Sequence, residues 1–216
     1  MSMKLVWVLL GVGLLMVYRG RIKADWVFFH TRRRDWLHDK WENWIKPLLI
    51  AGILAIGIRT FLVGPYKIPT GSMRPVLMEG DRIFVDKISY RFKSPRRGDI
   101  IVFKYPLDPK KDFVKRLVAF GGETVEIRGG QLYINGQKLE KPTSFAERFY
   151  YNRSDWVYGK EGQVISVPLG RLFVLGDNSA QSSDSRNWGF VPREDLIGRA
   201  VLIWWPPKRF RFLKNP

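Results

Sequence analysis

Two long apolar segments lie in the first third of the chain, and they constrain its fold more than any other feature. The first covers residues 5–18 and the second covers residues 47–64, interrupted there by a single arginine. A helix of about 20 mostly apolar residues is long enough to cross the hydrocarbon core of a bilayer. The pattern therefore predicts two transmembrane helices, over residues 4–20 and 44–64.

The first segment is shorter than an ordinary spanning helix, so a cleaved signal peptide is the alternative interpretation. A cleavage site of small residues would then follow it, whereas the chain continues with Arg19, Gly20 and Arg21. That continuation favours a retained helix. The second segment follows Trp41 and Trp44, and tryptophan concentrates at membrane interfaces. These tryptophans favour a membrane span over a buried helix of a soluble protein.

The connection between the two segments is strongly basic. Residues 19–46 carry eight Lys and Arg residues against four Asp and Glu residues. By the positive-inside rule, residues 21–43 form a cytoplasmic loop and residues 65–216 lie on the outer side of the membrane. The formal charge of +17 would suit nucleic acid or anionic lipid, and the apolar segments and nine tryptophans favour lipid.

From about residue 65 onward, short segments rich in β-branched and aromatic residues alternate with turn signals such as Gly-Asp, Gly-Gly and Asn-Gly. The segments are RIFVDKISY, DIIVFKYP, FVKRLVAF, ETVEIRGGQLYING, RLFVLGD and GRAVLIWW. This pattern predicts a mainly antiparallel β domain, either a barrel or a folded sheet. Residues 141–163 are polar and aromatic, and they predict an insertion or a long hairpin.

The scarcity of reactive residues narrows the chemistry. The chain has no cysteine, and its two histidines, His30 and His38, both fall in the basic connection. Nucleophilic catalysis on the outer side would therefore need Ser or Thr with a different base. Lysine can act as that base when burial disfavours its charged form.

Ser72 and Lys115 are the candidates for this pair. Ser72 lies in IPTGSMRP, where glycine and prolines constrain the backbone, although an ordinary polar linker has the same composition. At strand period Lys115 shares a face with Phe113 and Leu117, while Arg116 points the other way. Burial on that apolar face would lower the pKa of Lys115. The alternative is an edge-strand lysine that limits aggregation.

A third cluster, GDNSAQSSDSRNWGFVP, follows the strand-like segment RLFVL. It is dense in oxygen-bearing side chains, and one interpretation is a solvated loop that binds a hard cation. Asp177 and Asp184 are too few for a metal site, and no calcium-loop spacing fits. The other interpretation is a structural ion pair between Asp184 and Arg186, with a nearby serine hydroxyl orienting the lysine amine.

Four of these segments together resemble bacterial signal peptidase I, also called leader peptidase. RTFLVGPYKIPTGSMRPVL resembles the family's nucleophile motif, and GDRIFVDK resembles the strand after it. RGDIIVFKYP with KDFVKRLVAFGGE resembles the lysine motif, and GDNSAQSSDSRNWGFVPREDLIGRA resembles the closing motif. The resemblance extends from the second apolar segment to about Trp205.

The resemblance implies a role for individual residues. Ser72 would be the nucleophile and Lys115 its general base, and Thr70 would add a hydroxyl to the oxyanion hole. Ser182 would orient the lysine amine, supported by Asp184 and Arg186. The residues that would line shallow pockets for the small substrate residues before the cleaved bond are Tyr66, Ile68, Met73, Leu77, Phe113 and Val114. Val76 and Ser179 depart from the family's usual threonine and arginine, which affects fine specificity.

The implied protein is a membrane-anchored, mainly β serine endopeptidase: two N-terminal transmembrane helices and then an antiparallel, barrel-like catalytic domain over residues 65–216. It would sit in the inner membrane, with that domain on the periplasmic side. The resemblance implies no metal and no cofactor. Implied partners are preproteins with Ala-x-Ala signal peptides, membrane lipids and the export machinery, and nucleic acid is not among them. Two alternative interpretations remain: a specialised Ser–Lys peptidase for pilus or conjugation proteins, and a non-catalytic tethered β domain.

Overall fold

The structure is a computed structural model that describes residues 33–57, 63–140 and 143–213. The chain divides into two compact units, Met1–Gly57 and Ile58–Pro216. The predicted first membrane segment, residues 4–20, lies outside the described residues, as does most of the basic connection before residue 33.

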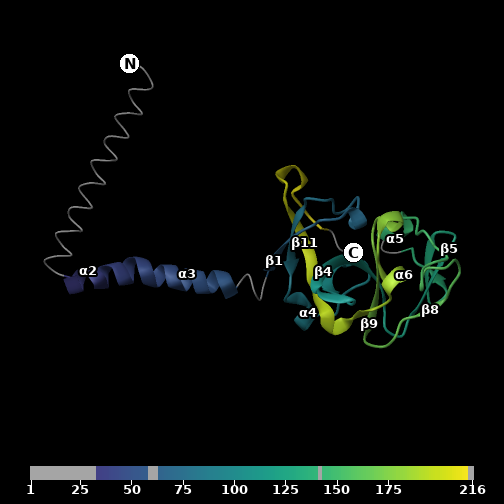
Figure 1. Cartoon of the computed structure of the whole chain (residues 1–216), viewed down its shortest axis with the longest axis horizontal. Coiled ribbons are helices and arrows are strands. Elements are labelled where there is room, and N and C mark those ends of the chain that lie inside the picture. The colour runs from purple at the N-terminus through teal and green to yellow at the C-terminus, as the bar shows by residue number, and fades with distance from the viewer. Residues whose placement is uncertain (1–32, 58–62, 141–142, 214–216) are drawn as a thin grey trace, which may run out of the picture. The chain divides into compact units, whose positions relative to one another are not determined.

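The first unit is helical in its described part. Helix α2 (Arg33–Lys40) is followed by the π-helical turn η1 (Trp41–Ile45) and by α3 (Lys46–Gly57), as Figure 1 shows. α3 consists almost entirely of apolar residues, and its large side chains are all exposed in this structure. Among the described residues, no helix combines the length and the apolar character that a membrane crossing requires.

The second unit is built on two antiparallel sheets, which confirms the predicted mainly β class. The larger sheet has eight strands in the order β1-β2-β11-β3-β4-β9-β10, with β12 also paired to β11. Its strands are β1 (Val63–Lys67), β2 (Arg82–Asp86), β3 (Ile100–Tyr105), β4 (Asp108–Phe120), β9 (Arg171–Leu175), β10 (Val191–Pro192), β11 (Leu196–Trp205) and β12 (Arg211–Phe212). β4 is therefore an interior strand, flanked by β3 and β9.

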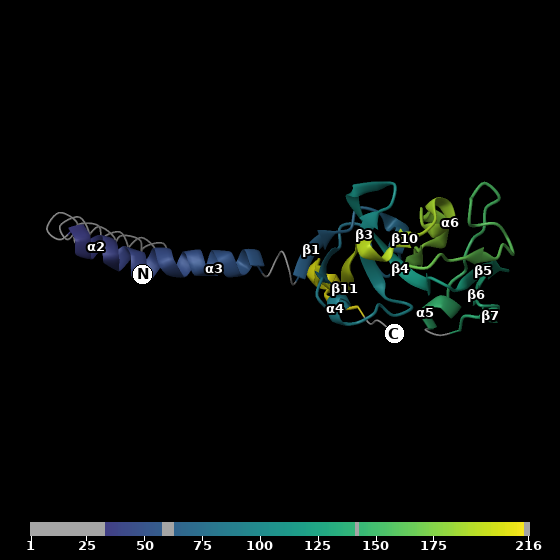
Figure 2. The ribbon, with the colours of Figure 1, turned by 90° about the horizontal axis from the view of Figure 1, so that it is seen from below.

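The smaller sheet contains four strands in the order β7-β6-β5-β8. Its strands are β5 (Thr124–Arg128), β6 (Gln131–Ile134), β7 (Gln137–Lys138) and β8 (Ile165–Ser166). The turns at Gly129-Gly130 and Asn135-Gly136 all have positive φ, which is the conformation of tight hairpin turns and explains these residue choices. Figures 1 and 2 show this sheet at the opposite end of the unit from β1.

Two predicted boundaries differ from the structure. β1 begins at Val63, so the last residues assigned to the second membrane segment pair with β2 instead. The segment RIFVDKISY continues as a strand only to Asp86. There the Asp86 carboxylate accepts hydrogen bonds from the backbone N–H groups of Ile88 (2.9 Å) and Ser89 (3.0 Å), which starts a helical turn.

Short helical turns connect the strands. They are α4 (Ser89–Phe92), α5 (Thr143–Ala146), α6 (Ser185–Trp188), η3 (Gly71–Met73), η4 (Ser179–Gln181), η5 (Arg193–Asp195) and η6 (Pro207–Arg209). Within described residues 143–163, α5 is the one regular element and no strand is present. This part of the segment is therefore an insertion rather than a hairpin, and Figure 2 shows α5 beside β6.

Candidate active site

Ser72 lies in η3, the single 3-10 turn that follows β1. Its side chain is buried, with the residue 7% exposed. The turn is held by Asn178, whose backbone N–H donates to the Ser72 carbonyl (3.0 Å) and whose Nδ2 donates to the Gly71 carbonyl (3.1 Å). A single residue from a distant part of the chain thus holds the backbone of the Ser72 turn.

Lys115 lies on β4 and contacts Ser72 directly. Its Nζ donates a hydrogen bond of 2.7 Å to Ser72 Oγ, and the residue is only 4% exposed. Because β4 is flanked on both sides by other strands, the edge-strand interpretation of this lysine is wrong. The structure thus brings together the two residues that the sequence selected as nucleophile and base.

The surroundings of Lys115 lower its pKa to about 8, from 10.5. Burial is the main cause, because removal from water disfavours the charged ammonium. The carboxylates of Asp184 and Asp177 act in the opposite direction, and the Arg186 guanidinium assists the lowering. An appreciable fraction of the amine is therefore neutral near physiological pH and is able to accept a proton.

Arg116, the next residue on β4, is also buried but has a carboxylate partner. Its Nε and Nη2 donate to the two oxygens of Asp177, both at 2.7 Å, and its Nη1 donates to the Gly98 carbonyl at 2.6 Å. This bidentate geometry gives the strongest form of Arg–carboxylate contact. It anchors Asp177, the neighbour of Asn178, to the central strand.

Asp184 and Arg186 form the predicted structural ion pair, and both are fully buried. Arg186 Nε donates to Asp184 Oδ1 (2.9 Å), and Nη2 donates to Oδ2 (2.8 Å). The remaining guanidinium donors bind the Ser179 hydroxyl and carbonyl and the Tyr151 carbonyl. Asp184 also accepts from the Gly176 N–H at 3.0 Å, so the pair fixes the loop from residue 176 to 186.

Thr70 and Ser182 were both expected to act beside the Ser72–Lys115 pair, and only Thr70 has a polar contact with it. Thr70 Oγ1 is 3.5 Å from Ser72 Oγ, so its hydroxyl lies beside the candidate nucleophile. Ser182 Oγ is buried and has no hydrogen-bond partner among the described residues, so the expected contact with the Lys115 amine is absent. The Ser182 side chain instead packs over Gly176, where an added Cβ would overlap it.

The predicted pocket residues fall in two places. Five share one hydrophobic cluster beside the Ser72 turn: Tyr66, Ile68, Met73, Leu77 and Val114. Phe113 belongs to another cluster and stacks on Tyr105, with ring centroids 4.1 Å apart. Met73 and Leu77 have no exposed surface, whereas Tyr66 and Val114 are half-buried. Burial, with the Asp112 carboxylate as a second cause, raises the pKa of the Tyr66 hydroxyl to about 12.

Sequence reasoning missed the residues that connect the closing loop to the site. Asn178 received no role, although it holds the Ser72 turn, and Asp177 was considered only as a weak metal ligand. Gly176 was also missed: an added Cβ there would come within 2.6 Å of the Ser72 carbonyl oxygen. The signal was the Gly-Asp-Asn triplet after a strand, but Asn178 binds Gly71, 107 residues away, and Asp177 binds Arg116, 61 residues away. Within the described part of the chain, no group of three or more His, Asp and Glu side chains is placed to hold a metal ion.

Comparison with known proteins gives this geometry its context. The family described as signal peptidase, peptidase S26, matches residues 41–205. A signal peptidase I of Leptolyngbya laminosa is 43% identical over 80% of this chain and 83% of the relative. A signal peptidase I of Aquifex aeolicus is 34% identical over 76% of this chain and 84% of the relative. A solved signal peptidase I structure from Enterococcus faecalis is 37% identical, covering 50% of this chain and 97% of that one with a TM-score of 0.40. The chain belongs to the signal peptidase family, peptidase S26.

Proposed function

We propose that the protein is a signal peptidase I, a serine endopeptidase that removes N-terminal signal peptides from exported preproteins after small residues. The single observation that carries this proposal is the buried contact of 2.7 Å between Lys115 Nζ and Ser72 Oγ. A lysine whose pKa is about 8 meets the requirement for a general base beside a serine. Membership of the signal peptidase family supplies the substrate class.

In the proposed reaction, the neutral Lys115 amine accepts the Ser72 hydroxyl proton along this contact as Oγ attacks the scissile carbonyl. The lysine then donates that proton to the amine of the departing mature protein, which leaves the signal peptide as an ester on Ser72. A water molecule, deprotonated by the same lysine, hydrolyses the ester and restores both side chains.

The negative oxygen that forms in each step needs hydrogen-bond donors. The Ser72 backbone N–H and the Thr70 hydroxyl are the proposed donors, and the position of Thr70 Oγ1 beside Ser72 Oγ supports this assignment. Asp184, Arg186 and Asn178 act as positioning residues, because they hold the loop and the turn without contacting the scissile bond. Ser182 stays a predicted positioning residue for the amine.

We further propose that this domain works at the outer face of a membrane, anchored by a helix over residues 4–20 and by the second apolar segment, from residue 44 to the start of β1 at Val63. The exposed apolar side chains of α3 support an anchor, because a helix that is apolar on all sides is stable when lipid or protein surrounds it. Anchoring enzyme and substrate in one bilayer raises their effective concentration. A protease added to the outside of spheroplasts should reach residues beyond 64 and leave residues 21–43 intact; protection of the C-terminal domain would contradict this topology.

Cleavage of preproteins by the purified full-length chain in detergent tests the activity. Ser72→Ala should abolish cleavage without unfolding the protein, and Ser166→Ala, an exposed serine on β8, is the matched control that should retain it. A general signal peptidase should process many unrelated preproteins, whereas a specialised enzyme would process few. If the wild-type protein cleaved no preprotein, that result would favour the alternative interpretation, a non-catalytic tethered β domain.

The oxyanion hole has its own test. Thr70→Val preserves the size and β-branching of the side chain but removes the hydroxyl, so kcat should fall about 10²-fold with folding unaffected. Thr70→Ser retains a hydroxyl and should keep much of the activity. An unchanged kcat in Thr70→Val would show that the hydroxyl has no catalytic role.

A further inference from the structure

A cavity of about 460 Å³ in the second unit contains an unusual concentration of positive charge. Three arginines are among the residues that line it: Arg116, Arg148 and Arg211. They come from three separate parts of the chain: β4, the insertion after α5 and the C-terminal strand β12. No described acidic residue is among the residues that line the cavity.

The charges around the cavity do not balance. Arg116 and Arg148 share a single carboxylate, that of Asp177, at 2.7 Å and 3.4 Å. Both arginine side chains are largely buried, at 4% and 15% exposed. Arg211 makes no ion pair among the described residues, and its Nη2 donates to the Val76 carbonyl at 2.7 Å. Two buried guanidinium groups thus share one carboxylate, and the exposed Arg211 adds a third positive charge beside them. A buried cation without a full counter-charge is unfavourable.

The rest of the lining also suits a ligand. The Ser144 hydroxyl is buried and has no hydrogen-bond partner in the described part of the chain. Val76, Phe212 and Leu213 form an apolar part of the wall, and Phe212 is 72% exposed. A polar donor set beside an apolar wall fits a ligand with an anionic group attached to a less polar part.

We propose that this cavity binds a phosphate group, which is carried by a phospholipid head group or is free in solution. Guanidinium groups hold phosphate oxygens through paired hydrogen bonds, and two or more arginines around one anion are typical of phosphate recognition. A phosphate would neutralise the excess charge of Arg148 and Arg211 and would accept a hydrogen bond from Ser144. The site is separate from the Ser72–Lys115 pair, and the proposal stands whether or not the protein cleaves preproteins.

Calorimetric titration of the full-length protein in dodecyl maltoside with inorganic phosphate tests the site, with sodium chloride holding ionic strength constant. The wild type should bind one phosphate in a saturable manner. Arg211→Gln and Arg148→Lys should each weaken that binding about tenfold, which corresponds to about 1.4 kcal/mol, because each removes paired charged hydrogen bonds to the phosphate. Arg211 is exposed, so its replacement should leave the fold intact.

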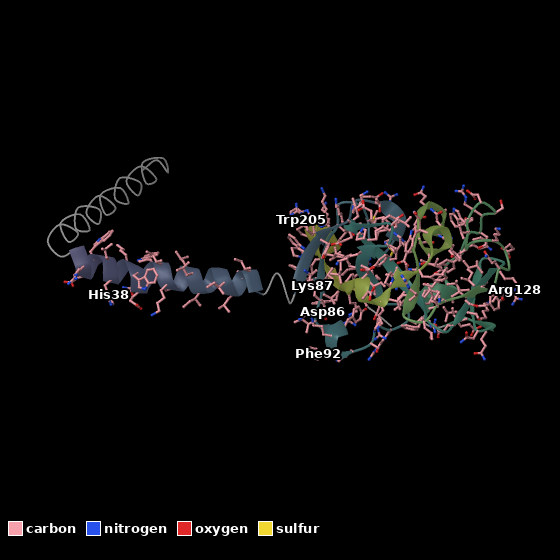
Figure 3. All side chains as sticks on the ribbon, turned by 60° about the horizontal axis from the view of Figure 1, so that its bottom comes forward. His38, Asp86, Lys87, Phe92, Arg128 and Trp205 are labelled. Atoms are coloured by element: carbon pink, nitrogen blue, oxygen red, sulfur yellow. The ribbon has the colours of Figure 1, made fainter. Side chains whose placement is uncertain are left out.

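Arg128→Gln is the matched control for the lost charge. Arg128 lies on β5 and does not line the cavity; Figure 3 shows it at the opposite end of the second unit from Trp205. This variant should bind phosphate as the wild type does. The proposal would be overturned if the wild type showed no saturable phosphate binding. It would also be overturned if folded Arg211→Gln and Arg148→Lys bound phosphate with the affinity of the wild type.

A second titration distinguishes the two sources of phosphate. Dihexanoyl phosphatidylglycerol, kept below its micelle-forming concentration, is compared with glycerol 3-phosphate. If the natural ligand is a lipid, the short-chain lipid should bind at least about tenfold more tightly, because its acyl chains pack on Phe212 and Leu213. Equal affinities would support free phosphate as the ligand. Loss of both in Arg211→Gln would support the shared site, and retention of both would contradict it.

Discussion

The two faces of β4 hold neighbouring buried cations in opposite ways. On one face, Lys115 donates to a serine hydroxyl and forms no ion pair with a carboxylate of the described residues, and its pKa falls to about 8. On the other face, Arg116 is equally buried but is clamped by both oxygens of Asp177. The cation that must lose its proton therefore has no ionic hydrogen bond, and the cation that must keep its charge has a bidentate one.

This difference explains why the two side chains are not exchangeable. Lysine changes its pKa readily on burial, whereas the guanidinium group stays charged in any workable solution. Burial without a paired carboxylate produces a base, and burial with one produces a structural support.

The largest effect should come from Lys115. Lys115→Met removes the amine while roughly keeping the shape of the side chain, so cleavage of a preprotein should fall at least about 10³-fold. Lys115→Arg should be equally inactive, because a guanidinium has no neutral form to accept the proton. In the wild type, kcat/KM should rise with pH through an apparent pKa near 8. A folded Lys115→Met protein that cleaves at a near-normal rate would exclude the Ser–Lys pair.

On the face of β4 that carries Arg116, substitution should lower the stability of the folded protein. Asp177→Asn leaves Arg116 buried without its counter-charge, which should lower the free energy of unfolding by about 3–5 kcal/mol. Asp155→Asn is the control, since its pair with Arg153 is exposed and should contribute less than about 1 kcal/mol. Urea unfolding at pH 7 measures both. A similar small loss of unfolding free energy in both variants would show that the buried Arg116–Asp177 pair contributes no more to stability than an exposed pair.

The third effect concerns the stability cost of the buried lysine. Well below pH 8 Lys115 is protonated in both the folded and the unfolded state, so the folded protein bears the full cost of a buried ammonium. Between pH 8 and 10.5 the unfolded chain binds more protons, so wild-type stability should rise with pH relative to Lys115→Met. At pH 7 Lys115→Met should therefore be more stable by about 1–3 kcal/mol. Urea unfolding of both proteins at pH 7 and pH 10 should show this gap narrowing, and a constant gap would contradict the lowered pKa.

The smallest effect is expected from Ser182→Ala. The Ser182 hydroxyl is buried without a hydrogen bond, so its removal should lower kcat by less than about tenfold and leave stability nearly unchanged. The pH dependence of kcat is the informative measurement, because a positioning role for the amine would shift its apparent pKa. A loss as large as that of Lys115→Met would mean that the hydroxyl binds the amine once substrate is present.

Much of this arrangement was predictable from the sequence because it depends on local patterns. Alternating β-branched segments predicted β3, β4, β5, β6, β9 and β11, and Gly-Gly and Asn-Gly predicted the turns of the smaller sheet. The elimination of Cys and His and the apolar neighbours of Lys115 made Ser72 and Lys115 candidates, and the family resemblance singled them out; the two side chains lie 2.7 Å apart.

The unpredicted parts depend on contacts between distant segments. Strand period placed Arg116 opposite Lys115 but did not show that β9 and Asp177 would bury it, because strand order is not a local property. The composition of the closing loop suggested solvated residues, whereas Asp177, Ser179 and Asp184 are buried. The strand beyond Asp86 was overpredicted, since a single carboxylate on two backbone N–H groups outweighed β propensity.

The hydrogen bonds from Asn178 to the Ser72 turn also set an order of events during synthesis. The bond to Gly71 joins residues 107 positions apart along the chain, and such distant contacts form late because closing a long loop is entropically unfavourable. A partly made chain that already contains Ser72 and Lys115 therefore still lacks the support of the nucleophile turn. The turn that carries Ser72 gains this support only after the chain has been made as far as Asn178 and that loop has folded back onto it.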